Sequence, residues 1–137
     1  MTRSRLAPVL ACLAAALLAA CGDAGGMALP DGAEPGVLTV SLTTPFPDDR
    51  AVLISVSGPL EAGAVAAAGQ GYTVHVRPSG TTFRAAVFGR ITSGPLVTFA
   101  VPDVNLASAY RATVQEVVDP SSNVRPTSTG YSLAVLR

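Results

Sequence analysis

The sequence predicts an all-β protein, an antiparallel sandwich of two sheets with about seven to eight strands. From Gly36 to the end of the chain, short runs of residues alternate between apolar and polar side chains. Clusters of Pro, Gly, Asp, Asn and Ser separate these runs, which is typical of turns. The alternation gives each strand one apolar face, as antiparallel sheets that pack on a single core require.

Residues 1–20 have the composition of a secretory signal rather than that of a folded domain. Arg3 and Arg5 make a positive start, and an apolar stretch runs from Leu6 to Ala20. A positive start, an apolar stretch and small residues before the cleavage site are the parts of a signal peptide. The apolar stretch is shorter than the roughly 20 residues of a membrane-spanning helix. An ordinary secretory signal, cut at its small residues, and an uncleaved anchor are the alternatives.

The tetrad Leu18-Ala19-Ala20-Cys21 closes this segment and resembles the lipobox of bacterial lipoproteins. The resemblance implies that residues 1–20 are a lipoprotein signal peptide that is removed, and that Cys21 is lipidated and becomes the new N-terminus. The family carries a diacylglyceryl group and usually a third, N-linked acyl chain. Each buried methylene contributes about 0.8 kcal/mol and a single chain binds only marginally, so a set of chains anchors stably.

The residue after the cysteine indicates which membrane is involved. Lipoproteins with Asp directly after the lipidated cysteine tend to stay in the inner membrane, whereas Gly22 follows it here. The resemblance therefore implies an exported, membrane-anchored protein. It favours the outer membrane, on its periplasmic or surface face, over the inner membrane.

From Cys21 onward the sequence predicts a flexible tether over residues 21–35 and a β-sandwich domain over residues 36–137. Gly and Pro recur through the tether, and nothing in it is periodic. The domain is long enough to bury a core without covalent links. No disulfide is expected, because Cys12 leaves with the signal and Cys21 is acylated.

In the first half of the domain, apolar residues at every second position predict the strands. Leu38, Val40 and Leu42 share one face of the first strand, which ends at the Pro- and Asp-rich segment after Thr43. The alanine-rich stretch before Gly69 predicts only a short strand, because its glycines disfavour a helix. The predicted strands are residues 37–43, 51–57, 64–67 and 72–77.

The second half of the domain predicts four more strands and two irregularities. Pro102-Asp103 predicts the start of a helical turn over residues 104–108. The adjacent Val117 and Val118 break the alternation and predict a bulge near the end of their strand. Phe88 and Leu136 fall on the outer, polar phase. The predicted strands are residues 81–88, 95–101, 109–118 and 131–136.

Seven or eight strands at this spacing in roughly 100 residues are typical of an immunoglobulin-like sandwich, and a small closed β-barrel is the alternative. The segments Gly36-Val-Leu-Thr-Val, Gly94-Pro-Leu-Val-Thr-Phe and Tyr110-Arg-Ala-Thr-Val-Gln, in this order, resemble cohesin and related carbohydrate-binding modules. That resemblance implies a jelly-roll-like sandwich that recognises dockerins or glycans. The chain has no Trp, so the aromatic strip of the glycan binders is missing.

No constellation of residues predicts catalysis, so we expect no enzyme, no cofactor and no metal site. His75 is the only histidine, while a Ser-His-Asp triad or a zinc site needs further groups. No Ser occupies a Gly-x-Ser-x-Gly elbow. Asp48, Asp49, Asp103 and Asp119 fall in predicted turns, where Asp usually bonds nearby backbone; calcium binding by these loop carboxylates is the alternative.

Three arginines are the candidate ligand-facing residues. Arg77, Arg84 and Arg111 fall on the outward faces of three predicted strands, and neighbouring strands would bring them into an exposed row of guanidinium groups. Such a row suits carboxylates or anionic sugars. A solvated face that limits self-association is the alternative. The chain has nine basic and nine acidic residues, which gives no basic patch for nucleic acid.

Anchor, tether and all-β domain together predict a lipid-anchored cell-envelope lipoprotein whose non-catalytic sandwich binds a protein or polysaccharide partner. A purely structural spacer subunit of an envelope assembly is the second hypothesis, and a hydrolase is the third. The expected partners are the membrane, through the lipid on Cys21, and an envelope protein or glycan. Nucleic acid is not expected, and no oligomeric state is predicted.

Overall fold

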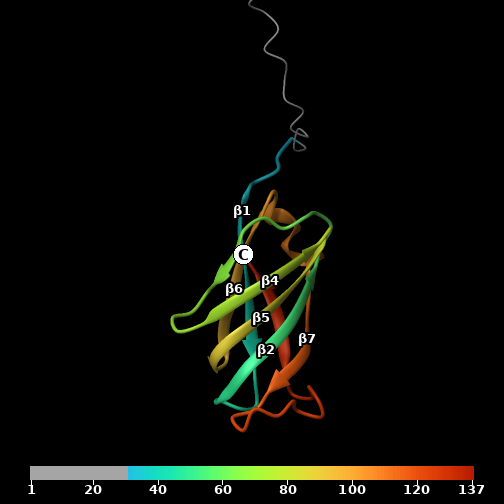
Figure 1. Cartoon of the computed structure of the whole chain (residues 1–137). Coiled ribbons are helices and arrows are strands. Elements are labelled where there is room, and N and C mark those ends of the chain that lie inside the picture. The colour runs from blue at the N-terminus through green and yellow to red at the C-terminus, as the bar shows by residue number, and fades with distance from the viewer. Residues whose placement is uncertain (1–30) are drawn as a thin grey trace, which may run out of the picture.

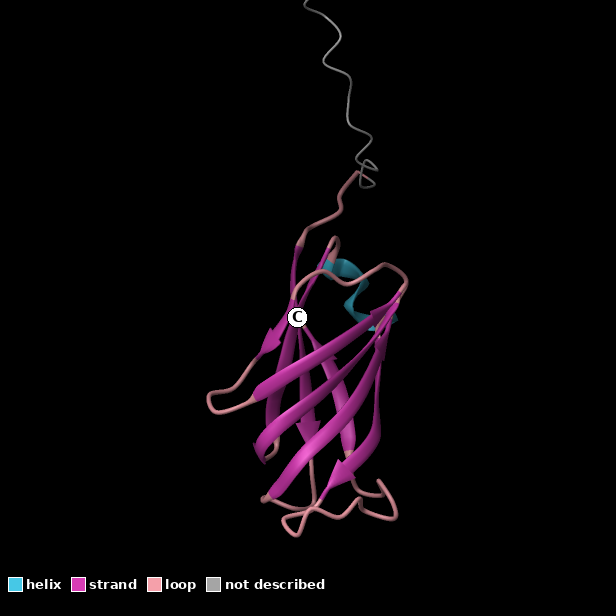
Figure 2. Ribbon diagram, in the orientation of Figure 1, coloured by secondary structure: helices cyan, strands magenta, loops and turns pink. Residues whose placement is uncertain are grey.

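The computed structural model describes residues 31–137, which form two four-stranded antiparallel sheets packed face to face (Figure 1). The strands are β1 (Gly36–Thr43), β2 (Asp49–Ser57), β3 (Val65–Ala67), β4 (Thr73–Ser79), β5 (Thr82–Ile91), β6 (Gly94–Val101), β7 (Arg111–Val118) and β8 (Ser132–Leu136). Sheet A has the order β3-β6-β1-β8, and sheet B has the order β4-β5-β2-β7. A short 3₁₀ helix, η1 (Val104–Ala109), lies at one end of the sandwich (Figure 2).

The predicted two-sheet sandwich is confirmed, and the alternative of a closed β-barrel is wrong. Within residues 31–137 every strand ladder lies inside sheet A or inside sheet B. The chain crosses from one sheet to the other at nearly every connection, and only the β4–β5 hairpin stays within one sheet. Connections of this kind leave two separate sheets that bury their apolar faces against each other.

The core lies between the sheets and is built mainly by their central strands. Phe99 of β6 lies at its centre, with its ring centroid 5.3 Å from that of Phe83 and 5.4 Å from that of Tyr110. In the edge strand β4, by contrast, Val76 is 38% exposed, because an edge strand has packed neighbours on one side only. The predicted inward residues of the central strands are all buried: Leu38, Val40, Leu42, Val52, Ile54, Val56, Phe83, Ala85, Val87, Val97, Phe99 and Val101.

The two predicted irregularities are both present, one of them displaced. The helical turn after Asp103 is η1. The bulge in β7 lies at Gln115 and not at Val117, because Leu53 pairs with Glu116 while Ile54 pairs with Val114. The extra residue shifts the phase, so that Val117 faces the core. In the sequence, the change in alternation becomes visible only at Val117, the next apolar residue. The bulge was therefore predicted two residues too late in the strand.

At the η1 end of the sandwich, Tyr110 closes the space between the sheets. Its ring lies on Gly58, where a Cβ atom would come within 2.1 Å of the ring, so only glycine fits directly after β2. Its hydroxyl donates a hydrogen bond to the carbonyl oxygen of Leu60 at 3.3 Å. Burial raises the pKa of Tyr110, and the nearby charge of Asp103 adds to this effect.

At the opposite end, Asp49 begins β2 with no exposed surface. Arg125, from the loop between β7 and β8, donates to its Oδ1 from Nε at 2.9 Å and from Nη2 at 2.6 Å. The Tyr131 hydroxyl donates to Oδ2. The Arg125 guanidinium also lies 3.7 Å from the centroid of the Phe46 ring. These four residues, here called the Asp49 cluster, join the β1–β2 loop, the β7–β8 loop and the start of β8.

We expect Tyr131→Phe to lower the free energy of unfolding by about 1–3 kcal/mol, because Asp49 Oδ2 loses its hydrogen-bond donor while it stays buried. Denaturant unfolding measures this difference. Tyr72→Phe is the matched control. The Tyr72 hydroxyl only accepts a long bond of 3.4 Å, from the exposed Thr92 N–H, so its loss should change stability little.

The wild type and Tyr131→Phe also differ in how their stability should depend on pH. Burial, followed by the hydrogen bond to Asp49, raises the pKa of Tyr131 from its ordinary value of 10.0 to about 12. The neutral hydroxyl therefore stabilises the fold fully below pH 10.0, and this contribution is lost as the pH rises through about 12. The stability difference between wild type and Tyr131→Phe should narrow over that interval. If the difference in the free energy of unfolding stayed constant over this pH interval, the Tyr131 hydroxyl would not donate a hydrogen bond to the Asp49 carboxylate.

Candidate functional site

The two sheets differ sharply in charge. The strands of sheet A contain no charged residue. The acidic residues in the strands of sheet B are Asp49, which is buried, and Glu116, which is exposed. The outer face of sheet B is therefore the cationic side of the sandwich. The arginines in the strands of sheet B are Arg50, Arg77, Arg84, Arg90 and Arg111.

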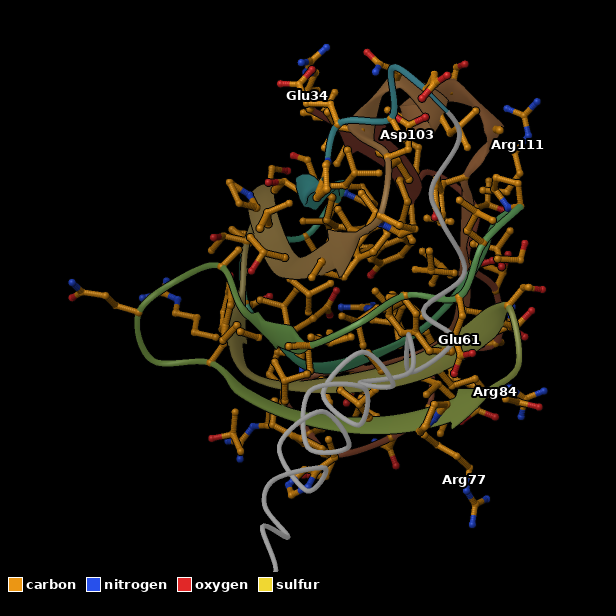
Figure 3. The ribbon with its side chains drawn as sticks, turned by 90° about the horizontal axis from the view of Figure 1, so that it is seen from above. Glu34, Glu61, Arg77, Arg84, Asp103 and Arg111 are labelled. Atoms are coloured by element: carbon orange, nitrogen blue, oxygen red, sulfur yellow. The ribbon has the colours of Figure 1, made fainter. Side chains whose placement is uncertain are left out.

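Arg77 and Arg84 lie directly opposite each other in the β4–β5 hairpin. Gly80, with a φ of 60°, occupies the short turn and sets the register that pairs Ser79 with Thr82. Both arginines are exposed on the outer face of sheet B. Figure 3 shows both side chains leaving the same corner of the sheet, in different directions. Like charges that face each other across two strands are destabilising, so this pair has an energetic cost.

Arg111, the third candidate, is separate from this pair. In the strand order of sheet B, β2 lies between β5 and β7. Arg84 is opposite Ser55 of β2, whereas Arg111 is opposite Ser57. Strand spacing and rise place the Cα atoms of Arg84 and Arg111 about 12 Å apart. Figure 3 shows Arg111 extending from another side of the molecule, so the expected row of three is a pair and a single residue.

A depression of about 410 Å³ lies beside the pair, lined by Arg77, Ser79, Thr82, Phe83 and Arg84. Phe83 faces the core and is 4% exposed, so its ring contributes little surface to the depression. The depression thus combines two guanidinium groups with two hydroxyl groups. Ser79 and Thr82 were not among the residues predicted for a site, although the Pro-Ser-Gly turn signal predicts the register that brings them together.

Neither arginine of the pair is neutralised within the part of the chain that the structure describes. In residues 31–137 the ion pairs are Asp49–Arg125 and Glu34–Arg137, both at 2.6 Å. Figure 3 shows Glu61 on the same side of the molecule as Arg84, but no ion pair joins them. Two adjacent cations that have no internal counter-ion are available to an anionic ligand.

A second depression, of about 470 Å³, lies near the Asp49 cluster and has mixed charge. Arg50 and Arg90 line it together with Asp48 and Asp49, and Gly89 and Pro120 complete it. Asp49 already accepts both hydrogen bonds of Arg125. Because acidic residues stand beside the arginines, an anion gains less here than at the Arg77–Arg84 pair.

Of the four aspartates predicted to lie in turns, Asp49 instead begins β2, and Asp103 and Asp119 have local structural roles. Asp103 accepts bonds from the backbone N–H of Asn105 at 3.0 Å and of Glu34 at 3.2 Å, and these bonds lower its pKa. Asp119 accepts from the backbone of Ser121 at 2.8 Å and from that of Asn123 at 2.9 Å. Between residues 31 and 137 no group of three or more His, Cys, Asp or Glu side chains could hold a metal ion.

His75 lies on the outer face of β4 and packs edge-on against Phe88, with ring centroids 5.8 Å apart. Phe88 and Leu136 stay on the outer phase, 46% and 50% exposed. The histidine thus forms part of the surface of sheet B, where its ring contacts an aromatic ring.

Cys21 and most of the predicted tether lie outside the described residues. Its last part is bonded to the domain: the Glu34 carbonyl oxygen accepts from the Val104 N–H at 2.8 Å, and the Glu34 carboxylate pairs with Arg137. The start of the described chain is thus attached to η1 and to the C-terminus. Across residues 31–137 no helix has the length and apolar character needed to cross a membrane.

No family model, no curated protein and no solved structure matches this chain. Among the residues of sheet B, the Arg77–Arg84 pair combines exposure, a depression and the absence of an internal counter-ion in residues 31–137.

We expect Arg84→Gln to raise the melting temperature by about 1–4 °C at low ionic strength, because it removes a like charge directly opposite Arg77. Differential scanning calorimetry at low and at high salt measures the effect, which salt should reduce by screening. Arg111→Gln, on the same sheet but opposite Ser57, is the matched control and should leave the temperature unchanged. A lower melting temperature for Arg84→Gln would mean that the pair does not repel.

Proposed function

We propose that the protein is a lipid-anchored lipoprotein of the cell envelope whose non-catalytic β-sandwich binds a partner through the outer face of sheet B. The observation that carries the proposal is the exposed Arg77–Arg84 pair, which has no ion pair in residues 31–137 and lies beside a depression. Selection for stability alone would separate these two charges, since each destabilises the other. A surface that keeps such a cost is typical of a binding site.

The anchor is supported by the N-terminal sequence. Arg3 and Arg5, the apolar stretch and the Leu18-Ala19-Ala20-Cys21 tetrad have the order that export and lipidation require. Acyl chains on Cys21 would hold the protein at a membrane without a spanning helix. Gly22 favours the outer membrane over the inner membrane.

The roles of the polar groups support a binding module over a hydrolase. His75 packs against Phe88, and Asp49 is occupied by Arg125 and Tyr131. A general base must reach the proton that it abstracts, and a triad needs its members in mutual contact. The arginines of sheet B are always charged, and they suit recognition of an anion rather than proton transfer.

The lipid anchor is tested by Cys21→Ser. We expect this variant to lose metabolic labelling with radioactive palmitate and to be released from washed membranes. Cys12→Ser is the matched control, because Cys12 lies in the apolar stretch and is removed with it, and it should keep both properties. Labelling that survives Cys21→Ser would refute acylation at this residue.

The binding function is tested by a pull-down. Full-length protein, purified from membranes in mild detergent and immobilised, is exposed to envelope extract with and without calcium. Mass spectrometry and sugar analysis identify what is retained. We expect a discrete protein or glycan that Arg77→Gln/Arg84→Gln loses and that Arg111→Gln keeps. Equal, empty columns for all three proteins would favour the spacer hypothesis instead.

A further inference from the structure

We propose that the depression beside Arg77 and Arg84 is a carboxylate-binding subsite for an acidic polysaccharide, in which the two guanidinium groups hold the carboxylate of one uronate residue. The inference rests on the proposed binding function and names the class of its ligand. It follows from the charge, the hydroxyl groups and the strand edge at this corner of sheet B.

The two guanidinium groups set the charge of the ligand. A guanidinium group presents a rigid fork of donors that matches the two oxygens of a carboxylate. Arg77 and Arg84 are cross-strand neighbours without an internal counter-ion in residues 31–137, so one bound anion would relieve their mutual repulsion. Relief of this repulsion would therefore add to the favourable free energy of binding.

The hydroxyl groups favour a sugar. Ser79 and Thr82 lie opposite each other and line the same depression. Each hydroxyl can donate one hydrogen bond and accept others, as the hydroxyl groups of a sugar ring also do. A volume of about 410 Å³ lies in the range of small-ligand sites. Two cationic and two hydroxyl groups together complement a ring that carries both a carboxylate and hydroxyl groups.

The strand edge argues against an acidic polypeptide. A bound peptide most readily adds a strand to an exposed sheet edge through backbone hydrogen bonds. β4 is such an edge, but Pro78 lies next to Arg77 and has no N–H to donate. The missing N–H of Pro78 disfavours the addition of a peptide strand at the point where the arginines lie. A polysaccharide forms no backbone hydrogen bonds of this kind, so the proline does not hinder its binding.

Isothermal titration calorimetry with polygalacturonate tests the inference, using full-length protein in detergent. The fully methyl-esterified polymer is the control ligand, because it keeps the sugar and loses the charge. We expect binding of the acidic polymer alone, weakened about tenfold by Arg77→Gln and by Arg84→Gln. Arg111→Gln should bind as wild type does, and Arg84→Lys, which keeps the charge and loses the fork, should be intermediate.

The outcomes separate this inference from the proposed function. Absence of polygalacturonate binding, equal binding of the esterified polymer, or equal weakening by Arg111→Gln would overturn the uronate subsite. Binding of poly-L-glutamate at least as tight would overturn it in favour of an acidic polypeptide. If the pull-down still captures a partner that depends on Arg77 and Arg84, the binding function stands while the uronate assignment falls. A melting transition in each variant confirms that it is folded.

Discussion

The buried carboxylate of Asp49 is the constraint on which one end of the sandwich depends. A charge without exposed surface is costly unless it is paired and hydrogen-bonded, and here Arg125 and Tyr131 supply both. The loop after β7 therefore returns to the start of β2, next to the point where β8 begins to pair with β1. The contacts of Asp49 thus connect the two sheets at this end.

The opposite end is held by η1, by Tyr110 on Gly58 and by the pairing of Glu34 with Arg137. Glu34, Asp49, Asp103 and Asp119 serve these two ends, as ion-pair partners, as the buried charge or as acceptors for backbone N–H groups. The arginines on the strands of sheet B do not take part in the ion pairs of residues 31–137. Within residues 31–137, Arg125 and Arg137 thus serve the fold through ion pairs, whereas the five arginines in the strands of sheet B are exposed. The net charge of zero does not show this uneven distribution.

The sequence could predict features that depend on neighbouring residues, but not those that depend on residues far apart along the chain. Period-two alternation predicted the central strands, because burial between two sheets acts residue by residue. It also predicted that Arg77 and Arg84 face outward. The separation of Arg111 from them depends on strand order, and the Asp49 cluster joins positions that are 76 and 82 residues apart. Neither leaves a local pattern, so both needed the folded structure.

The two interpretations of the arginine pair differ in what they require. An edge strand is protected against self-association by any charge or proline along it, and β4 already has Pro78. That purpose does not require a second arginine directly opposite the first, nor two hydroxyl groups facing each other beside them. Protection of an edge accounts for one charge on β4, whereas the proposed recognition of an anion would account for two like charges placed opposite each other at a cost in stability. The register of the β4–β5 hairpin is therefore the observation that supports the proposed ligand.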